Sequence, residues 1–169
     1  MKYIRFFKDG QVLEGILRKT QITLLEGSFL ESYAEAALQY QLDEVTLLPP
    51  TVPTKAVCVG LNYRDHANEM KLILPESPVL FIKPTTCVIA AGEAIVRPDL
   101  SKQVDYEGEL IIVIGKKAKN ITKEEASSYI LGYSIGNDVT ARDLQPKDGQ
   151  WTVCKGFYTF LPYGPVIET

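Results

Sequence analysis

The chain has 169 residues, of which 46% are hydrophobic and 23% charged, values typical of a globular protein with a buried core. The 18 basic residues are outnumbered by 21 acidic ones, and a net charge of −3 offers no basic surface to nucleic acid or to an anionic membrane. The chain holds no apolar run of the roughly 20 residues that span a bilayer, and no signal peptide. Its three widely spaced cysteines argue against a disulfide framework, so a cytoplasmic protein is the expectation.

The first fifty residues are predicted to form a small β-rich domain. Apolar residues concentrate at 3–7 and 12–17, on either side of Asp9-Gly10, a pair that favours the tight turn of a β-hairpin. Residues 22–25 could add a third strand, whereas 31–40 have a helical pattern. Prolines at 49, 50 and 53 interrupt regular structure. We therefore expect one domain at 1–53 and a second at 54–169.

The second domain is expected to contain more strand than helix, which makes the fold class α+β, mainly β. The sequence predicts strands at 56–59, 79–83, 110–114 and 133–137. The continuous apolar runs at 56–59 and 110–114 favour burial on both faces. A helix is expected at 65–71, and a capping-box pattern at Thr122 and Glu125 predicts another that continues to about Leu131.

Acidic residues flank one of these strands and follow another. Glu107 and Glu109 are two positions apart, so in an extended chain they point to the same face, next to the apolar run at 110–114. A hard cation would offset both the cost of burying the two carboxylates and their mutual repulsion. Asp138, directly after the strand at 133–137, could supply a third oxygen. The alternative is a solvent-exposed strand end, in which Asp105 extends an acidic row.

The candidate ligands restrict the kind of metal. Carboxylate oxygens favour Mg²⁺ or Mn²⁺, with Ca²⁺ as a third candidate, over zinc or copper. One histidine and no clustered cysteines cannot build a typical zinc site. Three carboxylates leave about three positions of an octahedral ion open. The keto and carboxylate oxygens of a 2-oxo acid could fill two of them.

The single histidine is the second candidate group. On a helix, His66 and Glu69 share one face, because they are three residues apart. A carboxylate beside an imidazole fixes its tautomer and raises its basicity, so the pair could take a proton from water. The alternative is an ordinary surface histidine paired with a helical glutamate.

Several short motifs occur in order between residues 56 and 166. They are Gly60-Leu61-Asn62-Tyr63 followed by His66 and Glu69, Leu80-Phe81-Ile82-Lys83-Pro84, Asp105-Tyr106-Glu107-Gly108-Glu109-Leu110, Asn137-Asp138-Val139-Thr140-Ala141-Arg142-Asp143-Leu144-Gln145, Lys155-Gly156-Phe157 and Gly164-Pro165. Each motif is weak alone, but together they resemble the fumarylacetoacetate hydrolase family.

This resemblance implies layered, mixed β-sheets and a homodimer. It implies Mg²⁺ or Mn²⁺ on Glu107, Glu109 and Asp138, and His66 with Glu69 as the pair that activates water. It also implies that Lys155 stabilises a developing oxyanion or enolate. The substrate-binding positions that it implies are Asn62, Arg142 and Gln145. Lys83 matches a family position whose role, in catalysis or in structure, stays open, and without the motif context Lys155 would be read as a surface lysine.

Two chemistries and one non-enzymatic interpretation follow from the resemblance. The first is hydrolytic cleavage of a C–C bond in an acylpyruvate-type diketo acid, for which His66 and Glu69 would supply the activated water. The second is decarboxylation or keto–enol tautomerisation of a 2-oxo dicarboxylate such as oxaloacetate. Family members continue beyond the last motif seen here, so the catalytic domain is expected to be incomplete at its C-terminus. A catalytically silent metal-binding fragment is therefore the third interpretation.

Overall fold

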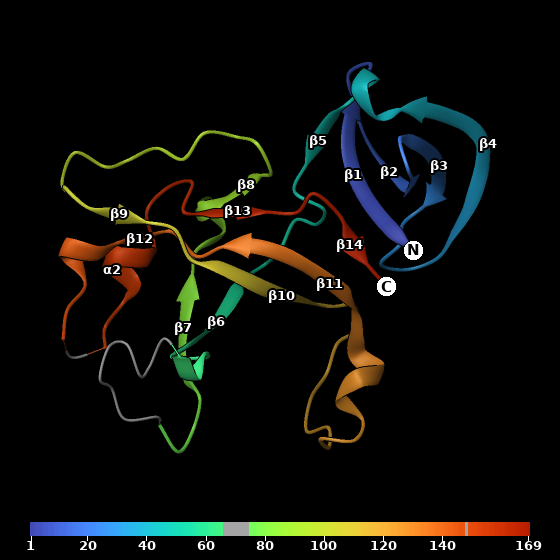
Figure 1. Ribbon diagram of the computed structural model, residues 1–169. Coiled ribbons are helices and arrows are strands. Elements are labelled where there is room, and N and C mark those ends of the chain that lie inside the picture. Colours follow the sequence, from blue (N-terminus) through green and yellow to red (C-terminus); the bar gives the residue numbers. More distant parts are fainter. Residues whose placement is uncertain (66–74, 148) are drawn as a thin grey trace.

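The computed structural model describes residues 1–65, 75–147 and 149–169, and strands dominate the described chain (Figure 1). The strands are β1 (Lys2–Lys8), β2 (Gln11–Arg18), β3 (Gln21–Gly27), β4 (Tyr33–Gln41), β5 (Thr46–Leu48), β6 (Ala56–Gly60), β7 (Val79–Lys83), β8 (Val88–Ala90), β9 (Val104–Asp105), β10 (Gly108–Ile114), β11 (Ile130–Asn137), β12 (Thr140–Ala141), β13 (Leu161–Tyr163) and β14 (Ile167–Glu168). The helical elements are short: α2 (Thr152–Lys155) and the 3-10 turns Leu42–Glu44, Thr85–Cys87, Ala126–Tyr129 and Arg142–Leu144.

The N-terminal strands form the predicted hairpin and extend it. Strands β1 and β2 pair antiparallel across Asp9 and Gly10, whose φ angles of 48° and 78° suit a tight hairpin turn. The third strand expected near 22–25 is β3. The helical expectation for 31–40 is wrong, because β4 covers most of this segment and pairs with β3. Its alanine-rich composition favours helix, and pairing with the sheet overrides that local preference.

One sheet runs through most of the described chain. This sheet has ten strands. Eight of them follow the path β4-β3-β2-β1-β14-β11-β13-β8, and the other two branch from it, with β5 paired to β1 and β10 paired to β11. The pairing of β1 with β14 joins the N-terminal strands to the rest, and Figure 1 shows both ends of the chain side by side there. Most pairs are antiparallel, whereas β8 and β13 are parallel. The expected mainly β fold with mixed sheets is confirmed.

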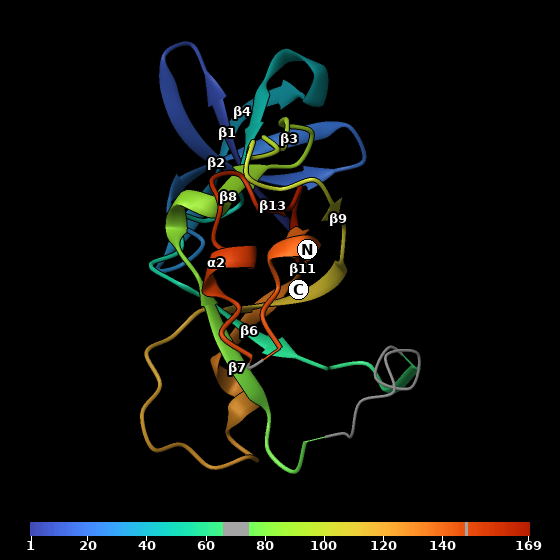
Figure 2. The same ribbon diagram turned by 90° about the vertical axis from the view of Figure 1, so that its left-hand side faces the viewer.

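The remaining strands form two small ladders around the candidate site. Strands β6 and β7 pair antiparallel, as do β9 and β12. Figure 2 shows β6 and β7 below the main sheet, with α2 next to the upper end of β7. Buried side chains form a cluster between these elements, which includes Val139, Ala141, Cys154 and Phe160.

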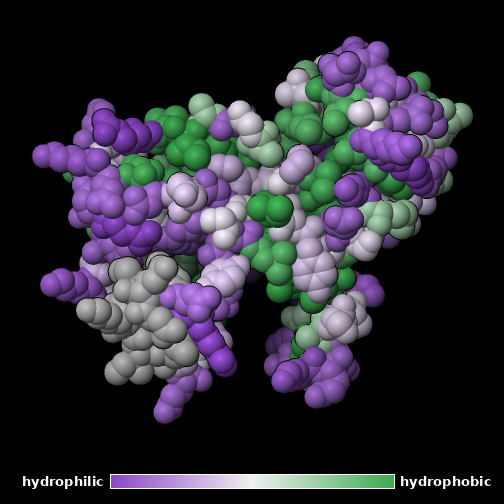
Figure 3. Space-filling view, in the orientation of Figure 1, coloured by the Kyte–Doolittle hydropathy of each residue, from purple (hydrophilic) through white to green (hydrophobic). Residues whose placement is uncertain are grey.

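The expectation of strands buried on both faces is wrong for the runs at 56–59 and 110–114. In β10, Leu110, Ile112 and Ile114 are each more than half exposed, and only the alternate face turns inward. Strand β6 likewise exposes Val57 and Val59. Figure 3 shows hydrophobic residues on the surface near the middle of the molecule. Apolar composition therefore did not distinguish a buried face from an exposed one.

The two predicted helices of the second domain have different outcomes. Thr122 and Glu125 exchange the reciprocal hydrogen bonds of a capping box, but only the short turn Ala126–Tyr129 follows. The helix expected to reach Leu131 is therefore wrong in extent, because Ile130 and Leu131 already belong to β11. The helix expected at 65–71 lies almost entirely outside the described residues.

Candidate active site

The candidate site lies where a β-ladder is interrupted. Gly108 of β10 pairs with Asn137 of β11, and Asp105 of β9 pairs with Thr140 of β12, so the same two chain segments pair on both sides of a gap. Within the gap the backbone amide of Asp138 donates to the carbonyl of Glu107 at 2.8 Å. Such breaks in regular pairing commonly redirect side chains next to active sites. Here the break places the carboxylates of Glu107 and Asp138 beside each other.

Lys155 bridges these two carboxylates. Its Nζ lies 2.8 Å from Glu107 Oε2 and 2.6 Å from Asp138 Oδ2, and the Lys155 side chain is only 5% exposed. A third hydrogen bond joins Nζ to Thr140 Oγ1 at 2.9 Å. All three ammonium protons therefore have acceptors, and the charge of Lys155 is directed at the gap in the ladder.

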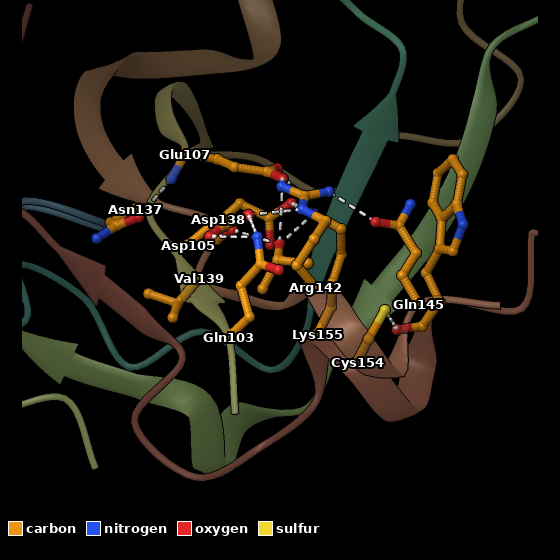
Figure 4. Close-up of polar contacts among 12 residues, drawn as sticks. Gln103, Asp105, Glu107, Asn137, Asp138, Val139, Arg142, Gln145, Cys154 and Lys155 are labelled. Atoms are coloured by element: carbon orange, nitrogen blue, oxygen red, sulfur yellow. Dashed lines mark hydrogen bonds and ion pairs between the residues drawn. The ribbon is translucent and has the colours of Figure 1, made fainter. Parts of the chain in front are cut away.

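The bridge is part of a longer chain of alternating charges (Figure 4). Beyond Asp138, Lys83 Nζ lies 2.6 Å from Asp138 Oδ1 and is fully buried. Beyond Glu107, Arg142 Nη2 donates to Oε1, while its Nε donates to Asp105 Oδ2 at 2.8 Å. Each carboxylate thus lies next to a cation, which offsets the cost of removing these charges from water.

Short elements hold the cations in place. Lys155 is the last residue of α2, and its amide donates to the carbonyl of Trp151 at 3.0 Å. Its Nζ also lies 5.1 Å from the centre of the Phe81 ring, which favours a cation. Arg142 begins a 3-10 turn, and its Nη1 donates to Gln145 Oε1 at 2.6 Å. The structure therefore brings Arg142 and Gln145 into one hydrogen-bonded group, as Figure 4 shows.

The two glutamates differ in their surroundings. For Glu107, burial raises the pKa, but the hydrogen bonds and charges of Lys155 and Arg142 outweigh burial, so its pKa is lowered. For Glu109, burial and the nearby charges of Asp138 and Glu107 raise the pKa, and the charge of Lys155 and a hydrogen bond from Tyr63 oppose them only in part. Within the described chain Glu109 forms no ion pair, in contrast to Asp105, Glu107 and Asp138.

A cleft of about 540 Å³ opens onto this cluster. It is lined by Tyr63, Val104, Asp105, Tyr106, Glu107, Gly108, Glu109 and Arg142. This volume is within the range of small-molecule sites. The lining contains three carboxylates, Asp105, Glu107 and Glu109, and one guanidinium, Arg142, so an anionic ligand would need a bound cation as well as Arg142 to offset the negative charge.

Not every predicted site residue lies at this cleft. Asn62 is exposed and lines a separate hollow of about 280 Å³, together with residues such as Val59 and Pro75. His66 and Glu69, the predicted water-activating pair, lie outside the described residues. Of the other predicted residues, Glu107, Glu109 and Arg142 line the cleft, whereas Asp138, Gln145 and Lys155 do not line it and belong to the hydrogen-bonded cluster beside it.

Three further residues of the cluster escaped the sequence analysis or were left without a role. Asp105 was read only as part of an acidic row, and Thr140 was not singled out, although both contact the cations of the site. Lys83 was left open between structure and catalysis. All three belong to the motifs given above, but a motif does not reveal contacts between residues 15 to 55 positions apart.

The candidate carboxylates are the right chemical type to bind a divalent metal, but their side chains are not arranged around a common point. Their oxygens are the hard ligands that Mg²⁺ and Mn²⁺ prefer. Glu107 and Asp138 retain lone pairs besides those that the cations use. Together with Glu109 and Asp105, four carboxylates face three cations. Among the described residues, however, no three His, Cys, Asp or Glu side chains form a ready metal-binding group, so binding by all three candidates requires side-chain movement.

Family models match nearly the whole chain. Residues 55–169 match the model described as fumarylacetoacetate hydrolase C-terminal, and residues 1–50 match one described as Rv2993c-like, N-terminal. The chain belongs to the fumarylacetoacetate hydrolase family. The region at 55–169 contains every residue of the ion-pair cluster, so the cluster belongs to the part of the chain that matches the fumarylacetoacetate hydrolase model.

Relatives and solved structures in this family include enzymes of three kinds. The rat mitochondrial oxaloacetate tautomerase Fahd2a is 40% identical over 169 residues, covering 95% of this chain and 54% of that protein. A 5-carboxymethyl-2-hydroxymuconate delta-isomerase from Mycobacterium smegmatis is 36% identical with a TM-score of 0.90, and this chain covers 67% of it. A fumarylacetoacetate hydrolase from Exiguobacterium antarcticum is 37% identical with a TM-score of 0.84, and 66% of it is covered. Both structures match the full length of this chain.

These values describe a chain that is shorter than its relatives. It spans about half the length of the rat protein and about two thirds of the two solved structures. Over the described residues, no helix has the length and apolar character to cross a membrane.

A glycine in β6 provides the space that α2 requires. A side-chain carbon added at Gly60 would collide with the ring of Trp151, whose carbonyl holds the amide of Lys155. We expect Gly60→Ala to destabilise the protein by about 1–3 kcal/mol through overpacking, measured by urea unfolding. As a control, Gly108→Ala adds a methyl group that meets open space and should change stability by less than about 0.5 kcal/mol. Equal stability of the two variants would contradict this role for Gly60.

The thiol of Cys58 is expected to be unreactive. Burial raises its pKa to about 11, and the nearby charge of Asp138 adds to the effect. Since the thiolate is the nucleophile, iodoacetamide should modify Cys58 in the folded protein at pH 8 at least about a hundredfold more slowly than in the protein unfolded in guanidinium. Peptide mass spectrometry distinguishes Cys58 from the buried Cys87 and Cys154. Similar rates in the folded and unfolded protein would contradict the expectation.

Proposed function

We propose that this protein is an enzyme that stabilises the enolate of a small 2-oxo acid, and that it interconverts the keto and enol forms of that substrate. The observation that supports this proposal is the buried Lys155, which joins Glu107 to Asp138 beside an open cleft lined by Arg142. Loss of a proton next to a ketone places negative charge on oxygen, and fixed cations in a poorly hydrated site stabilise such charge.

The described side chains suggest a division of roles. Arg142 lines the cleft, and its planar guanidinium can hold the substrate carboxylate through paired hydrogen bonds, with Gln145 fixing its orientation. Lys155 adds positive charge on the inner side of the cluster. Mg²⁺ or Mn²⁺, if bound by Glu107, Glu109 and Asp138, would supply Lewis-acid stabilisation of the same oxygen.

Two findings favour tautomerisation or isomerisation over the other reactions of the family. The rat relative at 40% identity is named for oxaloacetate tautomerisation, and a structural neighbour at 36% identity for an isomerisation. Keto–enol interconversion consumes no water: a carboxylate lining the cleft can take the proton from carbon, a proton is returned to the enolate oxygen, and the cations of the cluster stabilise the charge in between. We therefore place tautomerisation of a 2-oxo dicarboxylate first.

Hydrolytic cleavage of an acylpyruvate-type acid is the second candidate. The neighbour from Exiguobacterium antarcticum, at 37% identity, carries the hydrolase name. This reaction would use the same enolate stabilisation and would add a water activated by His66 and Glu69. Replacing His66 with Ala separates the two candidates, because it should abolish hydrolysis and leave a tautomerase that uses only the cluster.

An ultraviolet assay of the purified chain tests the proposal. We expect the enol absorbance of oxaloacetate to decay faster than in buffer when Mg²⁺ or Mn²⁺ is present, without release of pyruvate, and to return to the buffer rate after chelation by EDTA. Cleavage of an acylpyruvate would instead support the hydrolase. If neither substrate shows a metal-dependent change, the result would favour a catalytically silent protein. Light scattering of the same sample separately tests the expected homodimer.

A further inference from the structure

Lys83 is a charged side chain placed where solvent does not reach. It belongs to β7, is fully buried, and lies 6.0 Å from the centre of the Phe160 ring. Its Nζ donates to Asp138 Oδ1 at 2.6 Å and to the carbonyl of Val139 at 3.0 Å. Replacing a buried ion pair with well-packed apolar residues is often neutral or stabilising. Stability alone is therefore a weak reason for a lysine at this position.

The contacts of Lys83 fix one particular carboxylate. Asp138 Oδ1 is held by Lys83 from β7, and Oδ2 is held by Lys155 from α2, so two separate elements clamp the group from opposite sides. Lys83 also holds the carbonyl of the next residue, Val139, which fixes the backbone that carries Asp138. With Oδ1 engaged by Lys83, Asp138 can bind a cation only through the lone pairs of Oδ2 that Lys155 does not use.

Lys83 does not itself reach the cleft. It is absent from the residues that line the 540 Å³ opening, and it has no exposed surface with which to touch a substrate. Apart from its charge, Lys83 can therefore influence the site only through the groups that it holds, the Asp138 carboxylate and the carbonyl of Val139. Neighbours that orient a metal-binding carboxylate typically change metal affinity or activity by 10- to 100-fold when they are replaced.

We propose that Lys83 is a positioning residue that orients the Asp138 carboxylate and thereby sets the affinity of the site for a divalent cation. This inference rests on the proposed function, because it takes Asp138 as a ligand. It predicts that Lys83→Met weakens Mn²⁺ binding by about 10- to 100-fold, since Asp138 Oδ1 loses its partner and the carboxylate can rotate. Charge alone predicts the opposite result, because removing a cation near the site should strengthen the binding of another cation.

The test measures Mn²⁺ affinity by calorimetry and stability by thermal unfolding for the wild type, Lys83→Met and Lys83→Gln. The glutamine variant keeps an N–H donor for Asp138 and should retain more Mn²⁺ affinity than the methionine variant. If Lys83→Met does not fold, Lys83→Gln is compared with the wild type in its place. Ile16→Ala is a control for lost stability alone, because Ile16 is buried in a separate cluster with Tyr3 and Leu25 and should leave Mn²⁺ affinity unchanged.

A double-mutant comparison isolates the route of the effect. In an Asp138→Asn background, Lys83→Met should weaken Mn²⁺ binding by less than twofold, because the group that Lys83 orients is already altered. Unchanged or tighter Mn²⁺ binding by Lys83→Met, or an equal effect in both backgrounds, would overturn the inference. If the wild type binds no Mn²⁺, both the metal part of the proposed function and this inference fail. If the wild type binds Mn²⁺ and Lys83→Met binds it equally well, only this inference fails.

Discussion

Replacing Lys155 with Met should lower turnover by about 10²–10³-fold, the usual effect of removing a fixed group that stabilises developing negative charge. The same change should destabilise the fold by about 3–5 kcal/mol, because Glu107 and Asp138 would then face each other with less compensating charge. Turnover of oxaloacetate in the ultraviolet assay and urea unfolding measure the two effects.

A matched control separates the buried lysine from lysines in general. Lys117→Met makes the same chemical change at an exposed position and should alter stability by less than about 0.5 kcal/mol and leave turnover unchanged. A Lys155→Met variant as stable as Lys117→Met would show that the bridge contributes little to the fold. Full turnover in Lys155→Met would remove Lys155 from the proposed chemistry.

The two glutamates should respond oppositely to the same substitution. Glu107→Gln removes the charge that Lys155 and Arg142 share, and should cost about 2–3 kcal/mol, the value of hydrogen bonds to charged groups. Glu109→Gln removes a carboxylate without an ion pair among the described residues, next to two others of like charge, and should raise the midpoint of thermal unfolding at pH 7. Both variants should bind Mn²⁺ at least about tenfold more weakly than the wild type.

The pH dependence of stability provides an independent check on Glu109. Because its pKa is raised in the folded state, the native protein binds this proton more tightly than the unfolded chain does. Ionised Glu109 therefore opposes folding at neutral pH, and this cost disappears as the pH falls through the folded-state pKa. Glu109→Gln should consequently exceed the wild type in stability at pH 7 and lose that advantage in acid. A variant less stable than the wild type at pH 7 would show that Glu109 already has a stabilising partner.

The stability cost of Glu109 is what a binding site would require. A carboxylate held near Glu107 and Asp138 without its own cation is unfavourable for the fold alone, and such uncompensated groups commonly mark sites that bind a ligand. The remaining carboxylates of the cluster are paired with cations. The contrast separates a framework of ion pairs, which holds the site together, from the one carboxylate of the cluster that forms no ion pair among the described residues.

The sequence by itself determined those features that depend on near neighbours. The Asp9-Gly10 hairpin, the positions of seven of the fourteen described strands and the capping box at Thr122 and Glu125 follow from residues a few positions apart. The motif at 105–110 already placed two carboxylates close together, because alternate residues of an extended chain share a face. The order of the motifs was also sufficient to indicate the family.

Only the tertiary structure decided which charges meet. Lys83, Glu107 and Lys155 are separated by tens of residues from the partners that they bind, so their contacts depend on strand register and on where α2 packs. The exposed face of β10 and the strand at β4 were likewise misjudged, because apolar runs and helix-favouring composition do not reveal what lies against a segment. Ion pairing and burial are properties of neighbours in space, and local pattern does not contain them.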